Sequence, residues 1–249
     1  MAASAQAGMM SVNPAENVVI EDDDIGTGIR VRPNKIQGGS FNFTMKSWVK
    51  FDLTGEAPDG SQSATLSLYF RGSGTGNNPP NDPDWETSVY GLNAGYTPDE
   101  TNELGTDWSQ GDMNDNDAWQ RAPGNDQSSQ NEFDILQTTL LGTFDIDTDN
   151  DGGILDEKGT LFTISISTLS DFLQSDGTVT IMLAPTATQN TGGDSRDFWD
   201  NRHSAVDHDG NAATPAIDAR PTLEFTVIPE PASLTLIGVA GLAMLRRRR

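Results

Sequence analysis

The chain has 249 residues, contains no cysteine and carries a formal net charge of −22. A surface this acidic repels nucleic acid and anionic membranes, which excludes nucleic acid as a partner. A chain of this length can bury a core that is stable without disulfides, so the lack of cysteine does not prevent a single folded domain.

Residues 1–16 are expected to be the remnant of an export signal or a disordered N-terminus. The first seven residues, MAASAQA, have neither a basic start nor an apolar run. Their alternating small residues are nevertheless typical of the region where a signal peptide is cleaved. We therefore expect a hydrophobic region upstream of the printed start, and the alternative is an ordinary disordered N-terminus.

Residues 17–228 are expected to form one all-β domain, an antiparallel β-sandwich with long acidic loops. Apolar and polar residues alternate with the two-residue period of half-buried strands. This alternation occurs in residues 48–53, 64–70, 162–166, 179–183 and 223–227. Many short strands joined by Gly, Pro, Asn and Asp are typical of sandwiches and barrels.

Only residues 168–174 have the spacing of a helix in this domain. Leu169, Phe172 and Leu173 recur at helical intervals, and Ser167 or Thr168 is the expected N-cap. Residues 71–84 are rich in Gly, Asn and Pro and are expected to be a loop. Residues 94–131 are polar and long, and a loop of that length is usually functional or disordered.

Several segments resemble jelly-roll domains of the DNRLRE type. The matching segments are SWVKFDLTGEAPDGSQSATLSLYF (47–70), SVYGLN (88–93), AWQRAPGND (118–126), LSDFLQSDGTVTIML (169–183), SRD (195–197) and ARPTLEF (219–225). The resemblance implies a jelly-roll fold, and some members of that family bind polysaccharides.

The segment DIDTDNDGGILDEK, residues 145–158, is a candidate calcium site. Alternating carboxylates followed by a Gly-Gly turn suit the oxygen coordination of Ca²⁺, although the twelfth position of an EF-hand loop is occupied by Lys158. The predicted ligands are Asp147, Asp149, Asp151, Asp156 and Glu157. The alternative is a solvated acidic loop. Residues 205–218, which include Asp218, are a weaker candidate.

Two tryptophans in polar insertions, Trp85 and Trp108, are candidates for stacking on sugar rings. A flat indole ring can cover the apolar face of a sugar, while neighbouring Asp and Asn side chains bind its hydroxyl groups. The alternative is that these rings brace the core, which is the role we expect for Trp119 and Trp199.

No catalytic residues are predicted, and we expect the protein not to be an enzyme. The two histidines, His203 and His208, lie in one acidic loop, and the Gly-x-Ser-x-Gly signature of a hydrolase nucleophile is lacking. Arg196 and Arg202 lie beside His203, as a uronate-binding site would require. The simpler interpretation is that Arg196 pairs with a neighbouring acid.

Residues 229–249 differ in composition from the rest of the chain. Pro229 and Pro231 flank Glu230 and form a stiff joint that excludes a continuing helix. The next fourteen residues, 232–245, carry no charge. A helix of that length would span roughly 21 Å, which is short of a ~30 Å hydrocarbon core. The chain ends in four arginines: Arg246, Arg247, Arg248 and Arg249.

Basic residues that flank an apolar segment stay on the cytoplasmic side of a membrane, so the terminal arginines favour a transmembrane helix that acts as a processing signal. The complete pattern resembles the PEP-CTERM sorting signal of Gram-negative bacteria. The resemblance implies recognition by an exosortase in the inner membrane and cleavage near residues 229–231. The alternative is a permanent C-terminal anchor. Loss of the four arginines would change the formal charge from −22 to −26.

Together these observations predict an exported, non-catalytic protein of the cell surface, outer envelope or extracellular matrix of a Gram-negative bacterium. The expected partners are an exosortase in transit and extracellular polysaccharide, the expected cofactor is Ca²⁺, and the expected state is a monomer. The alternatives are a carbohydrate-binding module and a polysaccharide-active lyase or hydrolase.

Overall fold

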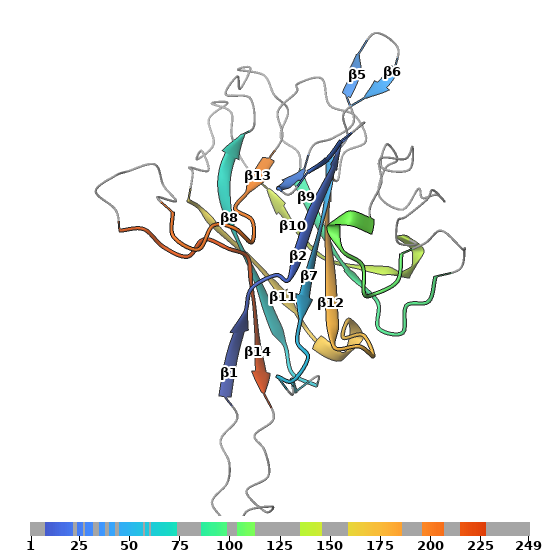
Figure 1. The fold of residues 1–249 in the computed structure, drawn as a ribbon, viewed down its shortest axis with the longest axis vertical. Coiled ribbons are helices and arrows are strands. Elements are labelled where there is room, and N and C mark those ends of the chain that lie inside the picture. Colours follow the sequence, from blue (N-terminus) through green and yellow to red (C-terminus); the bar gives the residue numbers. More distant parts are fainter. Residues whose placement is uncertain are drawn as a thin grey trace, which may run out of the picture.

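The computed structural model describes residues 8–21, 24–26, 28–31, 35–37, 40–42, 45–56, 58–59, 61–73, 86–98, 104–112, 135–145, 159–185, 196–206 and 215–227. Within these residues the chain is mostly β (Figure 1). The strands are β1 (Gly8–Val12), β2 (Glu16–Glu21), β3 (Asp24–Gly26), β4 (Ile29–Val31), β5 (Lys35–Gln37), β6 (Ser40–Asn42), β7 (Met45–Asp52), β8 (Ala64–Ser73), β9 (Glu86–Leu92), β10 (Thr138–Asp145), β11 (Leu161–Ile166), β12 (Thr178–Pro185), β13 (Arg196–Phe198) and β14 (Thr222–Val227). Short 3₁₀ turns are η1 (Gln110–Asp112), η3 (Ile135–Gln137) and η4 (Leu169–Asp171).

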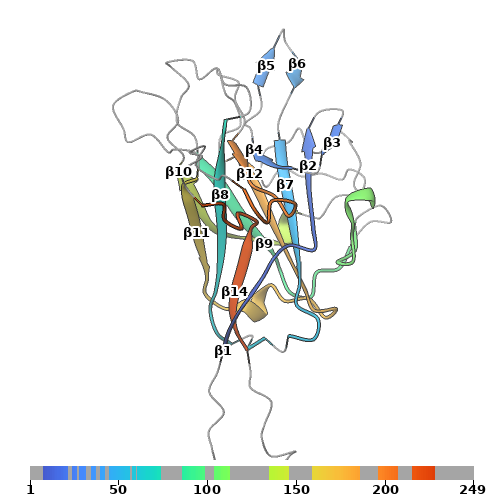
Figure 2. The ribbon, with the colours of Figure 1, turned by 60° about the vertical axis from the view of Figure 1, so that its left-hand side comes forward.

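Two antiparallel sheets of six strands each make up the body of the molecule (Figures 1 and 2). The first sheet has the order β1-β14-β8-β13-β4, and β11 also pairs with β8. The second sheet has the order β10-β9-β12-β7-β2-β3. Strands β5 and β6 form a separate hairpin at one end of the molecule.

The two sheets share one hydrophobic core, an arrangement consistent with the predicted sandwich. In β8, the side chains of Ala64, Leu66, Leu68 and Phe70 are buried, while the residues between them are partly exposed. Leu66 is the register partner of both Ile164 and Leu223, so the strands on either side contribute apolar side chains at the same level. All five segments with alternating apolar residues are strands that supply this core.

The central strands β7 and β12 of the second sheet are buried on both faces. All eight residues of β12 are buried, and so are seven of the eight in β7. A second apolar cluster covers the outer face: Val18, Trp48, Leu92, Tyr96, Leu104, Trp108, Met182 and Ala184. Part of the long polar stretch 94–131 therefore serves as a structural cover rather than as an open loop.

The helix expected at residues 168–174 is only the short 3₁₀ turn η4. Leu169 and Phe172 are both buried, and a spacing of three residues places them on one side of a 3₁₀ turn. Thr168 precedes the turn in an extended conformation, without a side-chain cap. Nucleation of a helix costs free energy that so short a segment does not recover from its own hydrogen bonds. Packing of the two side chains therefore decides that the segment is a 3₁₀ turn.

Strand β1 lies before residue 17, the start expected for the domain. It pairs with β14, and Met10 and Val12 pack against the core. Among the described residues, no helix is long and apolar enough to cross a membrane. The hydrophobic helix expected within residues 232–245 and most of the acidic loops lie outside the described residues.

Candidate functional site

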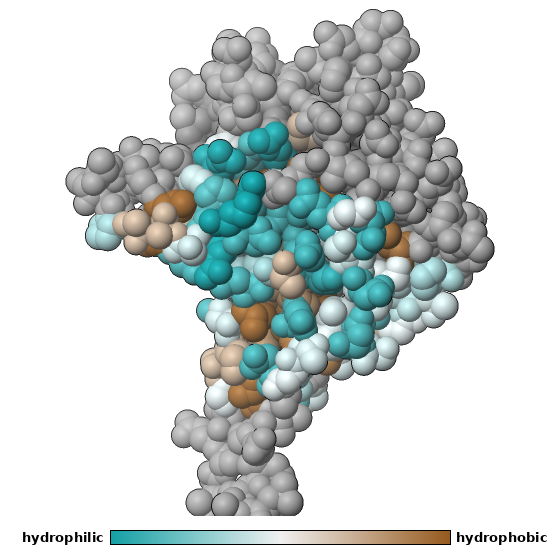
Figure 3. Space-filling model, viewed as in Figure 1, coloured by the Kyte–Doolittle hydropathy of each residue, from teal (hydrophilic) through white to brown (hydrophobic). Residues whose placement is uncertain are grey.

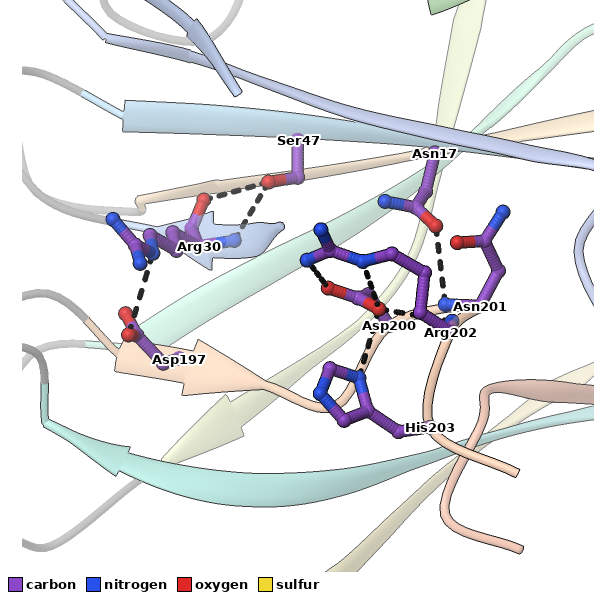
Figure 4. A network of polar contacts seen from close by, with 8 residues as sticks. All are labelled: Asn17, Arg30, Ser47, Asp197, Asp200, Asn201, Arg202 and His203. Atoms are coloured by element: carbon purple, nitrogen blue, oxygen red, sulfur yellow. Dashed lines mark hydrogen bonds and ion pairs between the residues drawn. The ribbon is translucent and has the colours of Figure 1, made fainter. Parts of the chain in front are cut away.

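The densest polar network in the described chain follows β13 (Figure 4). Strand β13 pairs with β8 through an irregular register at Asp197 and Phe198, and the Trp199 N–H then donates to the Tyr69 carbonyl at 3.0 Å. The chain turns immediately afterwards, because the His203 N–H donates to the Asp200 carbonyl at 3.2 Å. This turn gathers four consecutive polar residues, 200–203, directly after β13.

Asp200 is the centre of this network and is 1% exposed. Its Oδ1 accepts hydrogen bonds from the Arg202 N–H and from Arg202 Nε, both at 3.0 Å. Its Oδ2 accepts from Arg202 Nη2 at 2.5 Å. Nδ1 of His203 lies 2.8 Å from Oδ1. Both carboxylate oxygens are therefore occupied by groups within three residues of chain.

Burial of Asp200 disfavours its charged form and by itself would raise the pKa. The hydrogen bonds from Arg202, and the electrostatic attraction to His203 and Arg202, outweigh burial and lower the pKa below its ordinary value. Asp200 is thus held as a carboxylate. A buried carboxylate whose acceptors are all satisfied is suited to fixing a turn, because an unpaired one would be costly.

Aromatic and basic groups surround Trp199, which is 7% exposed. The imidazole ring of His203 lies 4.6 Å from the indole ring, centroid to centroid, and the guanidinium carbon of Arg71 lies 5.2 Å from the indole centroid. The contact with Arg71 has cation–π geometry. Trp199 therefore braces this turn against β8, as expected from the sequence, and its ring does not present an open face.

Two contacts join the network to the second sheet (Figure 4). The Asn201 N–H donates to Asn17 Oδ1 at 3.1 Å, and Asn17 belongs to β2. In β4, Arg30 both donates its N–H to Ser47 Oγ and accepts from that hydroxyl through its carbonyl, each at 2.8 Å. Since Ser47 lies in β7, these bonds connect opposite layers of the molecule. These contacts hold β4 and the turn after β13 against the second sheet.

Arg196 was expected to pair with a neighbouring acid, and its side chain lies outside the described part of the structure. The adjacent Asp197 instead pairs with Arg30, at 3.4 Å between Oδ2 and Nε. Sequence reasoning missed Asp200 altogether. The sequence does contain a signal, because Asp-x-Arg occurs at residues 194–196, 200–202 and 218–220. In the last of these, Asp218 and Arg220 form the same pairing at the surface.

The predicted calcium ligands lie outside the described residues: Asp147, Asp149, Asp151, Asp156 and Glu157. The chain leaves β10 at Asp145, whose register partner is Glu86, the residue after Trp85. Trp85 itself also lies outside the described residues. Trp85 and the predicted calcium segment therefore adjoin paired positions on the second sheet. Among the described residues, no group of three or more acidic, His or Cys side chains could hold a metal ion.

Trp108 is not the exposed sugar platform that the sequence suggested. It is 1% exposed and packs in the cluster on the outer face of the second sheet. Its Nε1–H donates to Thr180 Oγ1 at 3.0 Å, and Nζ of Lys50 lies 5.2 Å from the ring centroid. Lys50 Nζ also donates to the Trp108 carbonyl. The ring is almost fully covered within this cluster, so neither of its faces is available to a ligand.

The end of β14 leads directly into the C-terminal pattern. Strand β14 is paired on both sides, with β1 and with β8, and its last residue is Val227. Residues 227–249 match the PEP-CTERM protein-sorting motif. The chain carries a PEP-CTERM sorting motif. This motif indicates a protein that is exported in a Gram-negative bacterium and processed by an exosortase. No curated protein matches the chain.

Proposed function

We propose that the chain is a non-catalytic protein of the cell surface or of an extracellular polysaccharide matrix, delivered there by exosortase processing. The observation that carries the proposal is the PEP-CTERM motif at residues 227–249, which begins at the last residue of β14. The domain before it is a β-sandwich of the jelly-roll type, as its resemblance to DNRLRE domains suggests. Cleavage near residues 229–231 leaves every described strand in the mature protein.

A structural role for the Asp200 network supports the non-catalytic part of this proposal. His203 is oriented by a carboxylate, as a general base would be, but the same carboxylate is also bound by three donor groups of Arg202. The network links β13 and the turn that follows it to β2. We infer that the role of this network is to hold the two sheets together.

The rival functions are a carbohydrate-binding module and a polysaccharide-active enzyme. For the binding module, the candidate residues are Trp85 and the predicted calcium ligands, which adjoin the paired residues Glu86 and Asp145. A domain with a formal charge of −26 would repel anionic glycans unless Ca²⁺ bridged the charges. Binding to a glycan panel with Ca²⁺ and with EDTA separates these functions, and release of sugar fragments would identify an enzyme.

Mass spectrometry of the protein extracted from the cell surface tests the proposal itself. We expect a C-terminus near residues 229–231 in cells with the exosortase and the full chain in cells without it. Surface protein that still ends at Arg249 would overturn the proposed processing.

A further inference from the structure

The last residue of β14 is held on both sides. Val227 is the register partner of Gly8 in β1, and it also forms a β-bridge with Pro58. The Asp59 N–H donates to the Thr226 carbonyl at 2.7 Å. The chain therefore leaves the sheet from a fixed position, with β1 on one side and the segment between β7 and β8 on the other.

Only Ile228 separates this fixed residue from Pro229. An extended chain advances about 3.3–3.6 Å per residue, so residues 229–231 lie within about 7–14 Å of Val227. Proline has no N–H to donate to a β-ladder, which prevents pairing of the β1–β14 kind from continuing through the motif. The tether between the folded domain and the sorting motif is thus very short.

The beginning of β1 and the end of β14 lie at the same end of the molecule, which we call the tether pole (Figures 1 and 2). The turn η4 lies there too, because the Leu169 N–H donates to the Gln62 carbonyl just before β8 begins. Strand β8 then runs to Ser73, which pairs with Arg196 at the far pole. The two poles are roughly 30 Å apart along β8.

We propose that, before cleavage, the domain stands on the membrane with its tether pole toward the lipid surface and its far pole away from it. This orientation rests on the proposed function, in which residues 229–249 engage the inner membrane. Among the described residues, those of the tether pole lie nearest to the point at which the chain leaves the domain toward the bilayer.

Charge and apolar exposure favour the same orientation. The strongly acidic domain is repelled by anionic lipid, which opposes lying flat on either sheet. The tether pole carries Met9, a large apolar side chain that is 72% exposed. Figure 3 shows apolar residues over β1 and β14 at this end of the described surface.

Single thiols measure the orientation directly, because the chain contains no cysteine. The full-length variants Met9→Cys, Thr163→Cys and Glu86→Cys place one label at the tether pole, one midway along β11 and one at the far pole; all three side chains are exposed. Each labelled chain is incorporated into vesicles that contain phosphatidylglycerol and a short-range quencher on the lipid headgroups.

We expect quenching to fall from Met9→Cys through Thr163→Cys to Glu86→Cys, with a several-fold difference between the two poles. Equal or reversed quenching in vesicles that carry the chain would overturn the orientation and leave the proposed function intact. A chain that does not float with the vesicles would contradict the membrane role of the motif, and the orientation with it.

Two controls complete the design. A flexible Gly-Ser spacer between Ile228 and Pro229 should reduce the difference between the poles, because the longer tether lets the domain tumble. A difference that persists with the spacer would show that the tether does not set the orientation. If Met9→Cys melts at a lower temperature than the unsubstituted chain, Gln62→Cys supplies an exposed position near the same pole.

Discussion

Asp200 and Arg202 form a two-pronged ion pair in which Nε and Nη2 of the arginine donate to the two oxygens of a carboxylate that is 1% exposed. Asp218 and Arg220 have the same spacing and the same bonds, but the Asp218 side chain is 43% exposed. The chain thus contains one pair whose carboxylate is buried and a matched pair whose carboxylate is exposed.

The first prediction uses this match. Asp200→Asn keeps the shape but removes the charge that binds Arg202 and His203, so we expect a loss of about 1–3 kcal/mol in the free energy of unfolding. Asp218→Asn should cost about 0–1 kcal/mol, because water screens an exposed pair. Urea unfolding of both variants measures the difference. Equal losses would show that burial of Asp200 adds nothing to the strength of the pair.

The same pair predicts how stability depends on pH. The pKa of Asp200 is lowered in the folded state, so the unfolded chain binds its proton more readily. The stabilisation is complete above the ordinary Asp pKa of about 3.9 and is lost as the pH falls through the lower folded value. The difference in unfolding free energy between the unsubstituted chain and Asp200→Asn should therefore shrink in acid. A difference that is constant across this range would contradict the shifted pKa.

Trp108 is predicted to act through stability. Trp108→Ala should cost about 3–5 kcal/mol, because it opens a cavity on the outer face of the second sheet. Trp108→Phe retains most of the apolar contact but loses the Nε1–H bond to Thr180, which should cost about 1 kcal/mol. Combining Trp108→Phe with Thr180→Val should recover part of that loss, since no buried hydroxyl is then left without its donor. If Trp108→Phe binds glycan more weakly than the unsubstituted chain but is equally stable, Trp108 takes part in sugar binding and the stability interpretation is wrong.

Glu230→Ala separates processing from folding. Glu230 follows the last strand, so the variant should melt like the unsubstituted chain while it accumulates uncleaved in cells. Glu224→Ala is the matched control, because it removes the same charge from an exposed position within β14. Normal cleavage of Glu230→Ala would argue against recognition of the Pro-Glu-Pro tripeptide.

The predicted calcium site makes a separate thermodynamic prediction. A ligand that binds only the folded state stabilises it by about 2.7 kcal/mol at a hundredfold excess over Kd. Asp149→Ala should therefore lower the melting temperature in Ca²⁺ but not in EDTA. Asp171→Ala, an exposed aspartate outside the predicted site, should show no such dependence. NaCl at matched ionic strength controls for screening of the charges. If the unsubstituted chain melts at the same temperature in Ca²⁺ and in EDTA, residues 145–158 are a solvated acidic loop and not a calcium site.

The sequence alone located the main strands, because the alternation of apolar and polar residues is a local property. Residues such as Leu66, Leu68 and Phe70 recur every second position and lie in the core as expected. The sorting motif could also be identified from the sequence, since its proline joint, apolar segment and terminal arginines are contiguous. The five residues of β1 were missed, because a run that short stands out only once it is paired with β14.

Only the tertiary structure decided which polar and aromatic residues would be buried. Thr180 has the pattern of an outward-facing strand residue, yet it is buried because Trp108, 72 residues earlier, donates a hydrogen bond to it. Asp200 resembles many other aspartates in an acidic chain and becomes the centre of a network through the turn after β13. Burial of these groups depends on segments that are distant in sequence, and local periodicity carries no information about which segments will cover a given face.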